Sequence, residues 1–300
     1  METKKVLGID IGGTKTKIGL VTQQYNIVDK QIIIYTQNPT PEEVFEKISS
    51  KIQYNKWMYD SCGISIAGSL EHSTDKLIFS PNLKWANIDL KKVAGRYIPK
   101  VKEFENDANA SAWGIYCHEY GMKIKNFVCI TLGAGVGGGI IVNGKIYRGA
   151  HGSAGELGHM TIDPSGEKCN CGNYGCLETF VGAKYLSKKI KKKLNKSLSP
   201  SELFKLAEKG DSVARKIFEE MGEKLGIACA NIINILNPGA IVFTGGLTGA
   251  KRYYLEKLCK TVKIKLGKYY SDRTKILTSK MGEETGIIGA ACLVLHPFHA

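Results

Sequence analysis

The residues best suited to chemistry gather in one segment of the sequence, GELGHMTIDPSGEKCNCGNYGCLE at 155–178. Cys169, Cys171 and Cys176 fall within eight residues, and His159 stands ten positions before the first of them. Thiols and an imidazole at this spacing could form a redox switch, a disulfide, a zinc site or part of an active site. The segment by itself leaves these four interpretations open.

The cysteine count and the N-terminus bear on the disulfide. Nine cysteines is an odd number, and the opening METKKVLGIDIGG lacks the apolar stretch and cleavage site of a secretory signal. No apolar run approaches the roughly 20 residues needed to span a bilayer. We therefore expect an uncleaved cytoplasmic protein without a membrane partner, whose thiols are free or metal-bound. Six cysteines with mostly apolar neighbours are interpreted as inert core residues: Cys62, Cys117, Cys129, Cys229, Cys259 and Cys292.

A second chemical feature is the pair Asn106-Asp107, where the strand pattern of VKEFEN changes to the helical pattern of DANASAWGIY. A carboxylate at this junction could act as a general base, and an amide beside it can both donate to and accept from a hydroxyl group. An aspartate before an alanine-rich helix is equally typical of an N-cap. On the residues alone, the two roles for Asp107 are evenly matched.

Two glycine-rich turns, IDIGGTK at 9–15 and TLGAGVGG at 131–138, could hold phosphate oxygens with backbone N–H groups. Gly133, Gly135 and Gly138 also fit the dinucleotide pattern G-x-G-x-x-G. A strand and a hairpin signal follow them in place of a helix, so a nicotinamide site is not expected. Tight hairpins without a ligand would explain either turn alone. The two turns together, with Asp10 beside the first, favour phosphate binding.

Composition and charge describe the whole molecule. The 300-residue chain is 43% hydrophobic and 23% charged, with a net charge of +14, which is typical of a globular enzyme and argues against disorder. The run KKIKKKLNK at 188–196 could suggest nucleic acid. Leu186, Ile190 and Leu194 recur there at helical spacing, which favours an amphipathic helix with a solvated basic face and no nucleic-acid partner. A basic field would also attract an anionic substrate such as a nucleotide phosphate.

Strand and helix signals alternate along the chain. The first half is expected to contain strand, glycine turn and strand over 4–22, a second strand pair within 27–35, a helix over 41–54, a buried strand in 61–70 and the strand-to-helix segment 101–116. The second half is expected to contain strand, glycine turn and strand over 126–149 with a hairpin at Asn143-Gly144, helices over 178–235, a strand at 240–246, a helix after Gly249, a strand at 275–279 and a closing helix from Glu284. The two halves open alike, which predicts two similar lobes with a cleft between them.

The motifs IDIGGTK, ENDANASA, TLGAGVGGG and GELGH followed by CNCGNYGCLE, taken in order, resemble the ROK family of sugar kinases and sugar-responsive repressors. The most specific part is the match of His159, Cys169, Cys171 and Cys176 to the zinc motif of the family. Repressor members carry a DNA-binding helix-turn-helix module before the phosphate turn. Six residues precede Leu7 here, and this length favours the kinase branch.

The resemblance implies an α/β, two-lobed fold of the actin-like ATPase (ribonuclease H-like) type. Residues 1–115 and 284–300 are expected to form a small lobe completed by the C-terminal helix, and 116–283 a large lobe with the zinc site and nucleotide-side turns. It also implies Mg²⁺-assisted transfer of the γ-phosphate of ATP to a hexose, with glucose giving glucose 6-phosphate, in a homodimer. The alternatives are a kinase for GlcNAc or ManNAc and a catalytically silent sugar-binding regulator. The residues do not decide between ATP and polyphosphate as donor.

The resemblance also assigns roles to single residues, with Asp107 as the base that takes the sugar hydroxyl proton and Asp10 as the holder of Mg²⁺ through water. Residues expected at the sugar are Gly68, Asn82, Asn106, Asp107, Glu156, His159 and Glu178. Residues expected at the nucleotide are Asp10, Gly12, Gly13, Thr14, Lys15, Thr131, Gly133, Gly135, Gly245 and Gly246. Ala134 stands where family members often carry Thr, which removes one hydroxyl from the phosphate side.

One histidine and three thiolates have the usual composition of a closed structural Zn²⁺ site, so zinc is not expected to be the catalytic metal. Zinc bound through one nitrogen of His159 would leave the other nitrogen for a sugar hydroxyl. The same clamp would bring Glu156 and Glu178 together around the sugar. The alternative for these two glutamates is solvent-exposed charge.

Overall fold

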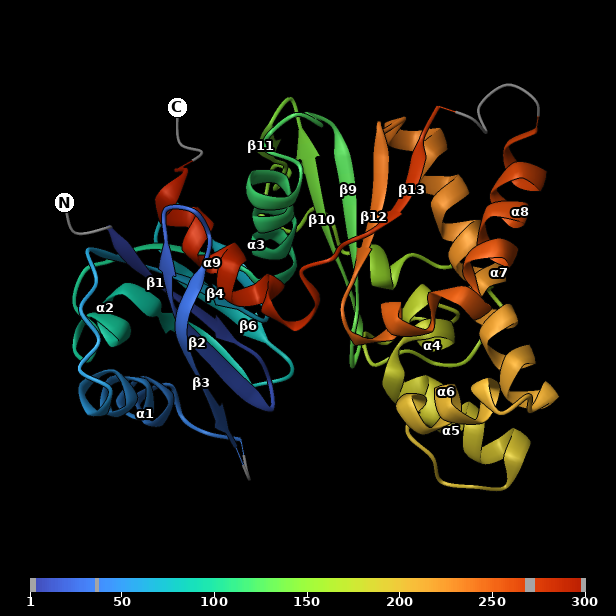
Figure 1. The fold of residues 1–300 in the computed structure, drawn as a ribbon, viewed down its shortest axis with the longest axis horizontal. Coiled ribbons are helices and arrows are strands. Elements are labelled where there is room, and N and C mark those ends of the chain that lie inside the picture. Colours follow the sequence, from blue (N-terminus) through green and yellow to red (C-terminus); the bar gives the residue numbers. More distant parts are fainter. Residues whose placement is uncertain (1–3, 36–37, 268–272, 298–300) are drawn as a thin grey trace. The chain divides into compact units, whose positions relative to one another are not determined.

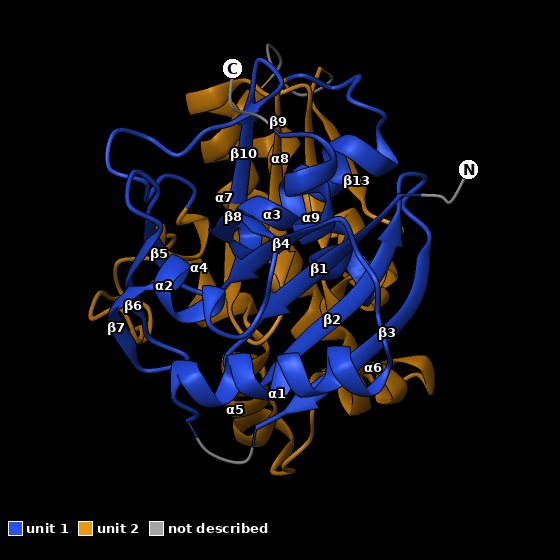
Figure 2. Ribbon diagram, turned by 90° about the vertical axis from the view of Figure 1, so that its left-hand side faces the viewer, with its two compact units in different colours: residues 1–125, 139–155, 283–300 blue, residues 126–138, 156–282 orange. Residues whose placement is uncertain are grey.

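The computed structural model describes residues 4–35, 38–267 and 273–297. The chain divides into two compact units, coloured separately in Figure 2. Unit 1 comprises Met1–Lys125, Gly139–Gly155 and Glu283–Ala300, and unit 2 comprises Asn126–Gly138 and Glu156–Gly282. Residues 116–125 and 139–155 thus belong to unit 1, whereas the ranges expected from the sequence put them in the large lobe. The outermost residues of the expected small lobe, 1–3 and 298–300, lie outside the described residues.

Unit 1 is built on a five-stranded sheet of order β3-β2-β1-β4-β8 (Figure 1). Its strands are β1 (Lys5–Ile11), β2 (Lys15–Thr22), β3 (Ile27–Ile34), β4 (Ser61–Ile66) and β8 (Val101–Asn106). Strands β1, β2 and β3 pair antiparallel, whereas β1 with β4 and β4 with β8 pair parallel. The expected second strand pair in 27–35 is wrong, because this segment is the single edge strand β3. The carboxyl ends of β1, β4 and β8 therefore lie at one edge of the sheet.

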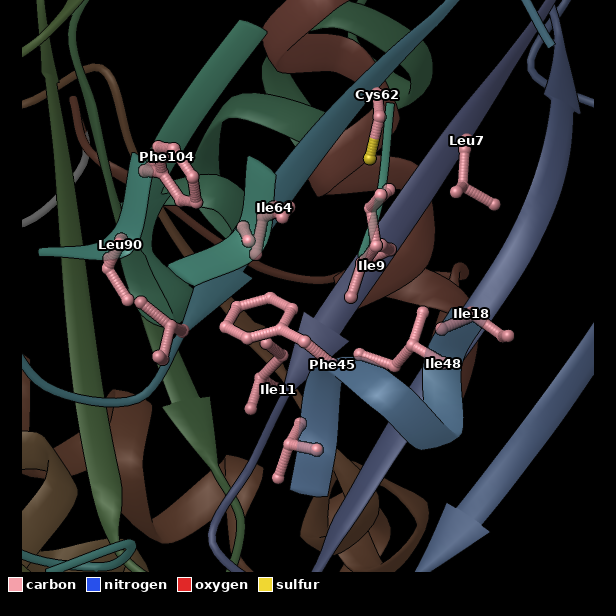
Figure 3. Close-up of a cluster of buried hydrophobic side chains, with 14 of the residues drawn as sticks. Leu7, Ile9, Ile11, Ile18, Phe45, Ile48, Cys62, Ile64, Leu90 and Phe104 are labelled. Carbon is pink, nitrogen blue, oxygen red and sulfur yellow. The ribbon is translucent and has the colours of Figure 1, made fainter. Parts of the chain in front are cut away.

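Helix α1 (Pro41–Tyr54) covers one face of this sheet and has the bounds expected from the sequence. Its start is fixed by a capping box, in which Thr40 and Glu43 exchange side-chain and backbone hydrogen bonds. The apolar face of α1 joins the strands in a single buried cluster, part of which Figure 3 shows. The helix contributes Val44, Phe45, Ile48 and Ile52, and the three central strands contribute Leu7, Ile9, Ile11, Ile18, Ile64 and Ile66.

Helix α9 (Thr285–Leu295), near the C-terminus, packs on the opposite face, where Val6 and Ile287 belong to one buried cluster. Alternate strand residues point to opposite faces, so Val6 and Gly8 face α9 while Leu7 and Ile9 face α1. A Cβ at Gly8 would lie 2.2 Å from Ile287 O, and one at Gly63 would lie 2.1 Å from Ala290 O. Glycine at these two strand positions lets the backbone of α9 approach the sheet closely.

A three-stranded antiparallel sheet lies between β4 and β8 in the sequence and was not expected. Its strands are β5 (Ser69–Glu71), β6 (Lys76–Ser80) and β7 (Trp85–Asp89). The short helix α2 (Leu90–Gly95) follows β7 directly. The strands are short and largely exposed, so their apolar pattern is weak. The sheet is anchored by Leu77 and Trp85, which are buried in the core cluster of unit 1.

The second five-stranded sheet has the order β11-β10-β9-β12-β13. Its strands are β9 (Phe127–Leu132), β10 (Val136–Val142), β11 (Lys145–Ile146), β12 (Ala240–Thr244) and β13 (Lys275–Thr278). Strand β12 pairs parallel with both β9 and β13. The turn between β10 and β11 has φ of 51° at Asn143 and 77° at Gly144, which confirms the expected hairpin. This order repeats that of the first sheet, as the similar opening of the two halves predicted.

Unit 2 carries most of the helices. They are α4 (Leu177–Val181), α5 (Ala183–Leu194), α6 (Pro200–Glu208), α7 (Ser212–Leu236) and α8 (Leu255–Leu266), with the 3-10 segments η2 (Leu157–His159) and η3 (Gly246–Tyr253). The amphipathic helix expected in the lysine run is α5, which buries Leu186 and Ile190. The helix expected after Gly249 begins instead as η3 and becomes α-helical only at Leu255. Within the described ranges, no helix has both the length and the apolar character needed to cross a membrane.

The six cysteines interpreted as core residues lie as expected. Five of them are buried, and Cys259 is half-buried. Burial raises the pKa of the Cys62 thiol, and likewise that of Cys229, so both thiols stay protonated. These residues therefore serve packing.

Candidate functional site

The sheet edge formed by the carboxyl ends of β1, β4 and β8 gathers several of the predicted residues of unit 1. Asp10 pairs in register with Ser65, and Ile66 pairs with Asn106, so these positions lie side by side across three strands. Gly68 follows β4 by two residues. In open α/β sheets, ligands bind at this edge of the parallel strands.

Asp10 is a half-buried carboxylate at this edge, and its Oδ1 accepts a hydrogen bond of 2.9 Å from Ser65 Oγ. Burial raises the pKa of Asp10, and the Ser65 hydrogen bond and the charges of Lys17 and Lys15 partly offset this rise. A Cβ at Gly286 would lie 2.1 Å from Asp10 Oδ2, so the first turn of α9 approaches the same carboxylate. A carboxylate that is costly to ionise without a partner suits a site for a cation.

The glycine turn after β1 brings Asn82 beside it. A Cβ at Gly13 would lie 2.6 Å from Asn82 Cβ, although the two residues are far apart in sequence. The Gly12 N–H donates to Lys15 O at 3.0 Å and closes the turn, while Thr14 is exposed. The ammonium group of Lys15, expected at a phosphate, lies 3.7 Å from a carboxylate oxygen of Glu283.

The strand-to-helix change at Asn106-Asp107 lies where the sequence predicted it, between β8 and α3 (Asp107–Gly114). The helix cap, however, is Asn106. Its Oδ1 accepts from the backbone N–H groups of Ala108 at 2.9 Å and Asn109 at 3.1 Å, and its Nδ2 donates to Gly68 O at 3.1 Å. The evenly matched N-cap interpretation of Asp107 is therefore wrong. Asp107 is the half-buried first residue of α3, and its Oδ1 shares the Ala108 N–H at 3.0 Å.

Glu105, one residue before this junction, was not singled out in the sequence. Its side chain is fully buried, and Arg148 binds its Oε2 through Nε at 2.9 Å and Nη2 at 2.6 Å. Its Oε1 accepts from Asn106 N–H at 2.9 Å and Asn109 Nδ2 at 3.1 Å, and lies 3.4 Å from His72 Nε2. The sequence does carry a signal for Glu105, because it is a glutamate at an inward-facing strand position directly before Asn106. A charge buried at such a position is seldom found without a partner.

In unit 2 the structure brings together His159, Cys169, Cys171 and Cys176, whose ligand atoms all lie within 4.8 Å of one another. The Cys169 Sγ and His159 Nδ1 atoms are 3.6 Å apart, as are the Sγ atoms of Cys171 and Cys176. Zinc bonds of about 2.3 Å to sulfur and about 2.0 Å to nitrogen, in a tetrahedron, require ligand separations of this size. The four residues therefore fit a zinc ion.

The loop that carries the three cysteines is shaped by glycines and backbone pairing. Cys169 N–H donates to Asn173 O at 2.7 Å, and Ile162 N–H donates to Gly175 O at 2.8 Å. Gly175 has φ of 65°, and a Cβ there would lie 1.5 Å from Asp163 O, so only glycine fits.

Glu156 lies three residues before His159, the histidine of this cluster, in the sequence GELGH. The Nδ1 atom of His159 faces the thiol of Cys169, while its Nε2 lies 4.0 Å from Glu156 Oε2. The Glu156 side chain is 55% exposed and that of His159 is 36% exposed. Nε2 and the carboxylate are thus accessible to a polar ligand. A Cβ at Gly158 would lie 2.0 Å from Val136 O, so this segment packs tightly on β10.

Glu178, in the first turn of α4, is not a solvent-exposed charge. Its Oε2 accepts from Val136 N–H at 2.9 Å, and a Cβ at Gly135 would lie 2.3 Å from the same oxygen. One carboxylate oxygen of Glu178 therefore holds the glycine turn 133–136.

The nucleotide-side turns of unit 2 lie at the ends of two paired parallel strands, since Thr131 of β9 is in register with Thr244 of β12. Thr131 Oγ1 accepts from Gly137 N–H at 3.0 Å, which leaves the hydroxyl proton to donate elsewhere. Gly245 has φ of 95°, and a Cβ there would lie 2.5 Å from Leu132 O. The two turns therefore touch through their backbones.

Ala134 is exposed in the glycine turn, and its carbonyl accepts from Lys184 N–H at 3.3 Å while Gly133 O accepts from Ala183 N–H at 3.0 Å. The missing hydroxyl at Ala134 is thus accompanied by backbone hydrogen bonds that join the turn to the start of α5.

Each unit gathers its own set of predicted residues. Unit 1 holds Asp10, Gly12, Gly13, Thr14, Lys15, Gly68, Asn82, Asn106 and Asp107, and unit 2 holds Thr131, Gly133, Gly135, Glu156, His159, Cys169, Cys171, Cys176, Glu178, Gly245 and Gly246.

Comparison with known proteins shows which family the chain belongs to. The model of the ROK family matches residues 6–296. The chain is 30% identical over 311 residues to a glucokinase from Streptomyces coelicolor, covering 97% of this chain and 98% of that one. It is 32% identical over 249 residues to a xylose repressor from Caldicellulosiruptor bescii, covering 78% of this chain and 62% of the repressor.

Among solved structures, a ROK family glucokinase from Streptomyces griseus in complex with glucose and AMPPNP superposes with a TM-score of 0.86 and 29% identity, covering 96% of this chain and 98% of that one. The likeness confirms the α/β fold of the actin-like ATPase type expected from the motifs. Because the family model spans nearly all of the described residues, and a relative matches over almost its full length, the chain belongs to the ROK family.

Proposed function

We propose that this protein is an ATP-dependent hexose kinase that converts glucose to glucose 6-phosphate. The supporting observation is the arrangement at the start of α3, where Asn106 caps the helix and Asp107 stands beside it at the carboxyl edge of three parallel strands. Asp107 Oδ1 shares the Ala108 N–H with Asn106, and a carboxylate at this position can accept a proton as a base. The glucokinase relative and the glucose and AMPPNP complex of the structural neighbour support the same substrates here.

In this proposal Asp107 accepts the proton of the attacking sugar hydroxyl as the oxygen approaches the γ-phosphorus. Asn106, Asn82 and the backbone at Gly68 orient the sugar, since short polar groups can both donate to and accept from hydroxyls. The glycine turns and Thr131 hold phosphates through N–H and O–H donors. Magnesium supplies charge neutralisation at the phosphates when bound, and Asp10 is the residue that would hold it through water.

The Cys₃His cluster is proposed to hold a structural Zn²⁺. Four protein ligands complete a tetrahedron and leave no position for a reacting water. His159 would use Nδ1 for the metal, since that nitrogen faces Cys169, and would present Nε2 to a sugar hydroxyl beside Glu156. Glu178 would join it with the carboxylate oxygen that does not hold the glycine turn.

A second candidate is a sugar-binding regulator without turnover, because a xylose repressor is 32% identical over 78% of this chain. A kinase acting on an N-acetylated hexosamine is a further form of the first proposal, since the same polar groups would serve a larger sugar. We also propose that the protein is cytoplasmic and that it forms a homodimer, the commonest symmetric assembly. Sedimentation of the purified chain would test the dimer.

A panel assay tests these candidates together. Purified protein is supplied with Mg²⁺ and either ATP or polyphosphate, and with glucose, mannose, xylose, GlcNAc or ManNAc, and phosphoryl-donor consumption is measured. We expect turnover with glucose and ATP above every other pair. Turnover confined to GlcNAc or ManNAc would select the hexosamine kinase. Binding of a sugar without turnover on any donor would select the regulator.

A further inference from the structure

We infer that Glu105 is a positioning residue that fixes the Asn106-Asp107 junction, and that its partner Arg148 ties this junction to the loop leading into Glu156. This inference rests on the proposed function for its catalytic consequence. It differs from the assignment of Asp107, because the Glu105 side chain is fully buried and its contacts are with protein groups.

The Glu105 carboxylate is surrounded by donors on both oxygens. Arg148 occupies Oε2 with a two-pronged contact through Nε and Nη2, at 2.9 and 2.6 Å. Oε1 accepts from Asn106 N–H and from Asn109 Nδ2, at 2.9 and 3.1 Å, with His72 Nε2 at 3.4 Å. Both carboxylate oxygens thus accept hydrogen bonds, and the guanidinium of Arg148 makes the contact at Oε2 a charge-assisted one.

Two of these contacts act directly on the proposed catalytic junction. The bond from Asn106 N–H fixes the peptide that precedes the cap, and the bond from Asn109 fixes a buried side chain in the first turn of α3. Asn106 in turn orients Ala108 and Asn109 through its Oδ1. Asp107 lies between these fixed points, so its direction depends on Glu105. A shift of about 1 Å in a reacting group can cost about a hundredfold in rate.

The other contacts join segments that are distant in sequence but all belong to unit 1. Arg148 begins a loop that Ala154 N–H closes onto Arg148 O at 3.0 Å. A Cβ at Gly152 would lie 2.7 Å from Leu70 O, so the loop also packs on β5. The loop ends at Gly155, and the next residue in the chain is Glu156, proposed to bind the sugar. One buried ion pair thus anchors both the junction with the proposed base and the start of the GELGH segment.

The test removes both charges, because removing one would leave the other in a largely buried place without the opposite charge. The variant Glu105→Gln/Arg148→Met is compared with wild type and with a control, Lys193→Met/Glu220→Gln. The control removes the carboxylate that pairs with Lys189 and Lys193, each at 2.6 Å, between α5 and α7. Three properties are measured: cooperative thermal unfolding, kcat and KM for glucose and ATP, and hydrogen exchange of the backbone amides in 104–110. Arg148→Lys, which keeps the charge but loses the planar fork, is measured in the same way.

We expect the double variant to unfold cooperatively, to lose about a hundredfold in kcat with the KM for ATP nearly unchanged, and to exchange the Ala108 and Asn109 amides faster than wild type. The control should match wild type in kcat and in exchange. Arg148→Lys should lose about tenfold in kcat. If the double variant does not fold, the kcat and the amide exchange of Arg148→Lys decide whether the ion pair positions the junction.

A folded variant with wild-type kcat and wild-type amide exchange would overturn the positioning role, and so would a lower melting temperature as the sole change. If the wild type itself turns over no sugar, the proposed kinase function fails, while the exchange of residues 104–110 still decides whether Glu105 holds the junction.

Discussion

At the start of α3, the helix cap and the proposed base are different residues, Asn106 and Asp107, although a single aspartate could have filled either role. Asn106 satisfies two N–H groups of the first turn, and Glu105 holds the peptide before it. Asp107 Oδ1 shares one of these N–H groups, that of Ala108, so the cap does not depend on Asp107 alone. The sequence could predict the position of this junction from the change of pattern, but the identity of the cap depended on backbone geometry that the pattern does not contain.

Replacing Asp107 tests its role as base. Asp107→Ala is expected to lower kcat by about 10²–10⁴-fold, the usual contribution of a positioned proton acceptor, while glucose binding measured by calorimetry is partly retained. Asp89→Asn serves as control, because Asp89 caps α2 and asparagine caps a helix equally well. Turnover of Asp107→Ala within about tenfold of wild type would mean that another group takes the proton.

Cys171 tests the metal cluster, because it is exposed and contributes little to packing. We expect Cys171→Ser to lose bound zinc, measured by elemental analysis, and to raise the KM for glucose by about tenfold or more, since His159 is no longer held. Cys259→Ser, a half-buried cysteine outside the cluster, should keep the metal content and KM of wild type. Full zinc content in Cys171→Ser would contradict the assigned ligand set.

Periodicity and turn signals correctly predicted those helices, strands and turns that depend mainly on local sequence. The α1 helix, the strand after each glycine turn and the Asn143-Gly144 hairpin all have strong local signals, and all are present. The sheet β5-β6-β7 has short, exposed strands and depends on contacts with the core, so it was missed. Glu105 was missed for a related reason, because its partners Arg148 and His72 come from loops that only the fold brings to it.

The close contact between α9 and the sheet gives a prediction for unit 1. A Cβ at Gly63 would lie 2.1 Å from Ala290 O, a backbone atom that cannot move aside without shifting the helix. Gly63→Ala should therefore lower the free energy of unfolding by about 3 kcal/mol, measured with denaturant. Gly95→Ala, at the end of α2 with no atom near the added carbon, should be neutral or slightly stabilising. Equal stability of the two variants would show that α9 does not pack closely on the sheet.

For the whole molecule, the repeated strand order is the main outcome. Both five-stranded sheets have a meander on one side of the first strand and parallel strands on the other. Each carries some of its predicted residues at the carboxyl edge of the parallel strands, Asp10 and Asn106 in the first and Thr131 in the second. The sequence predicted this repeat from the two similar openings. It could not assign residues 139–155 to unit 1, because that depends on contacts such as Arg148 with Glu105.

Phosphorus NMR of the reaction tests the central claim most directly, namely that the chain transfers the γ-phosphate of ATP to a sugar hydroxyl with Asp107 as base. Wild-type protein is incubated with glucose, ATP and Mg²⁺, and the phosphate ester signal is followed beside that of ADP. The account predicts a growing glucose 6-phosphate signal in wild type that is nearly abolished in Asp107→Asn. ADP and inorganic phosphate without a sugar ester, or an equal ester signal from Asp107→Asn, would contradict it.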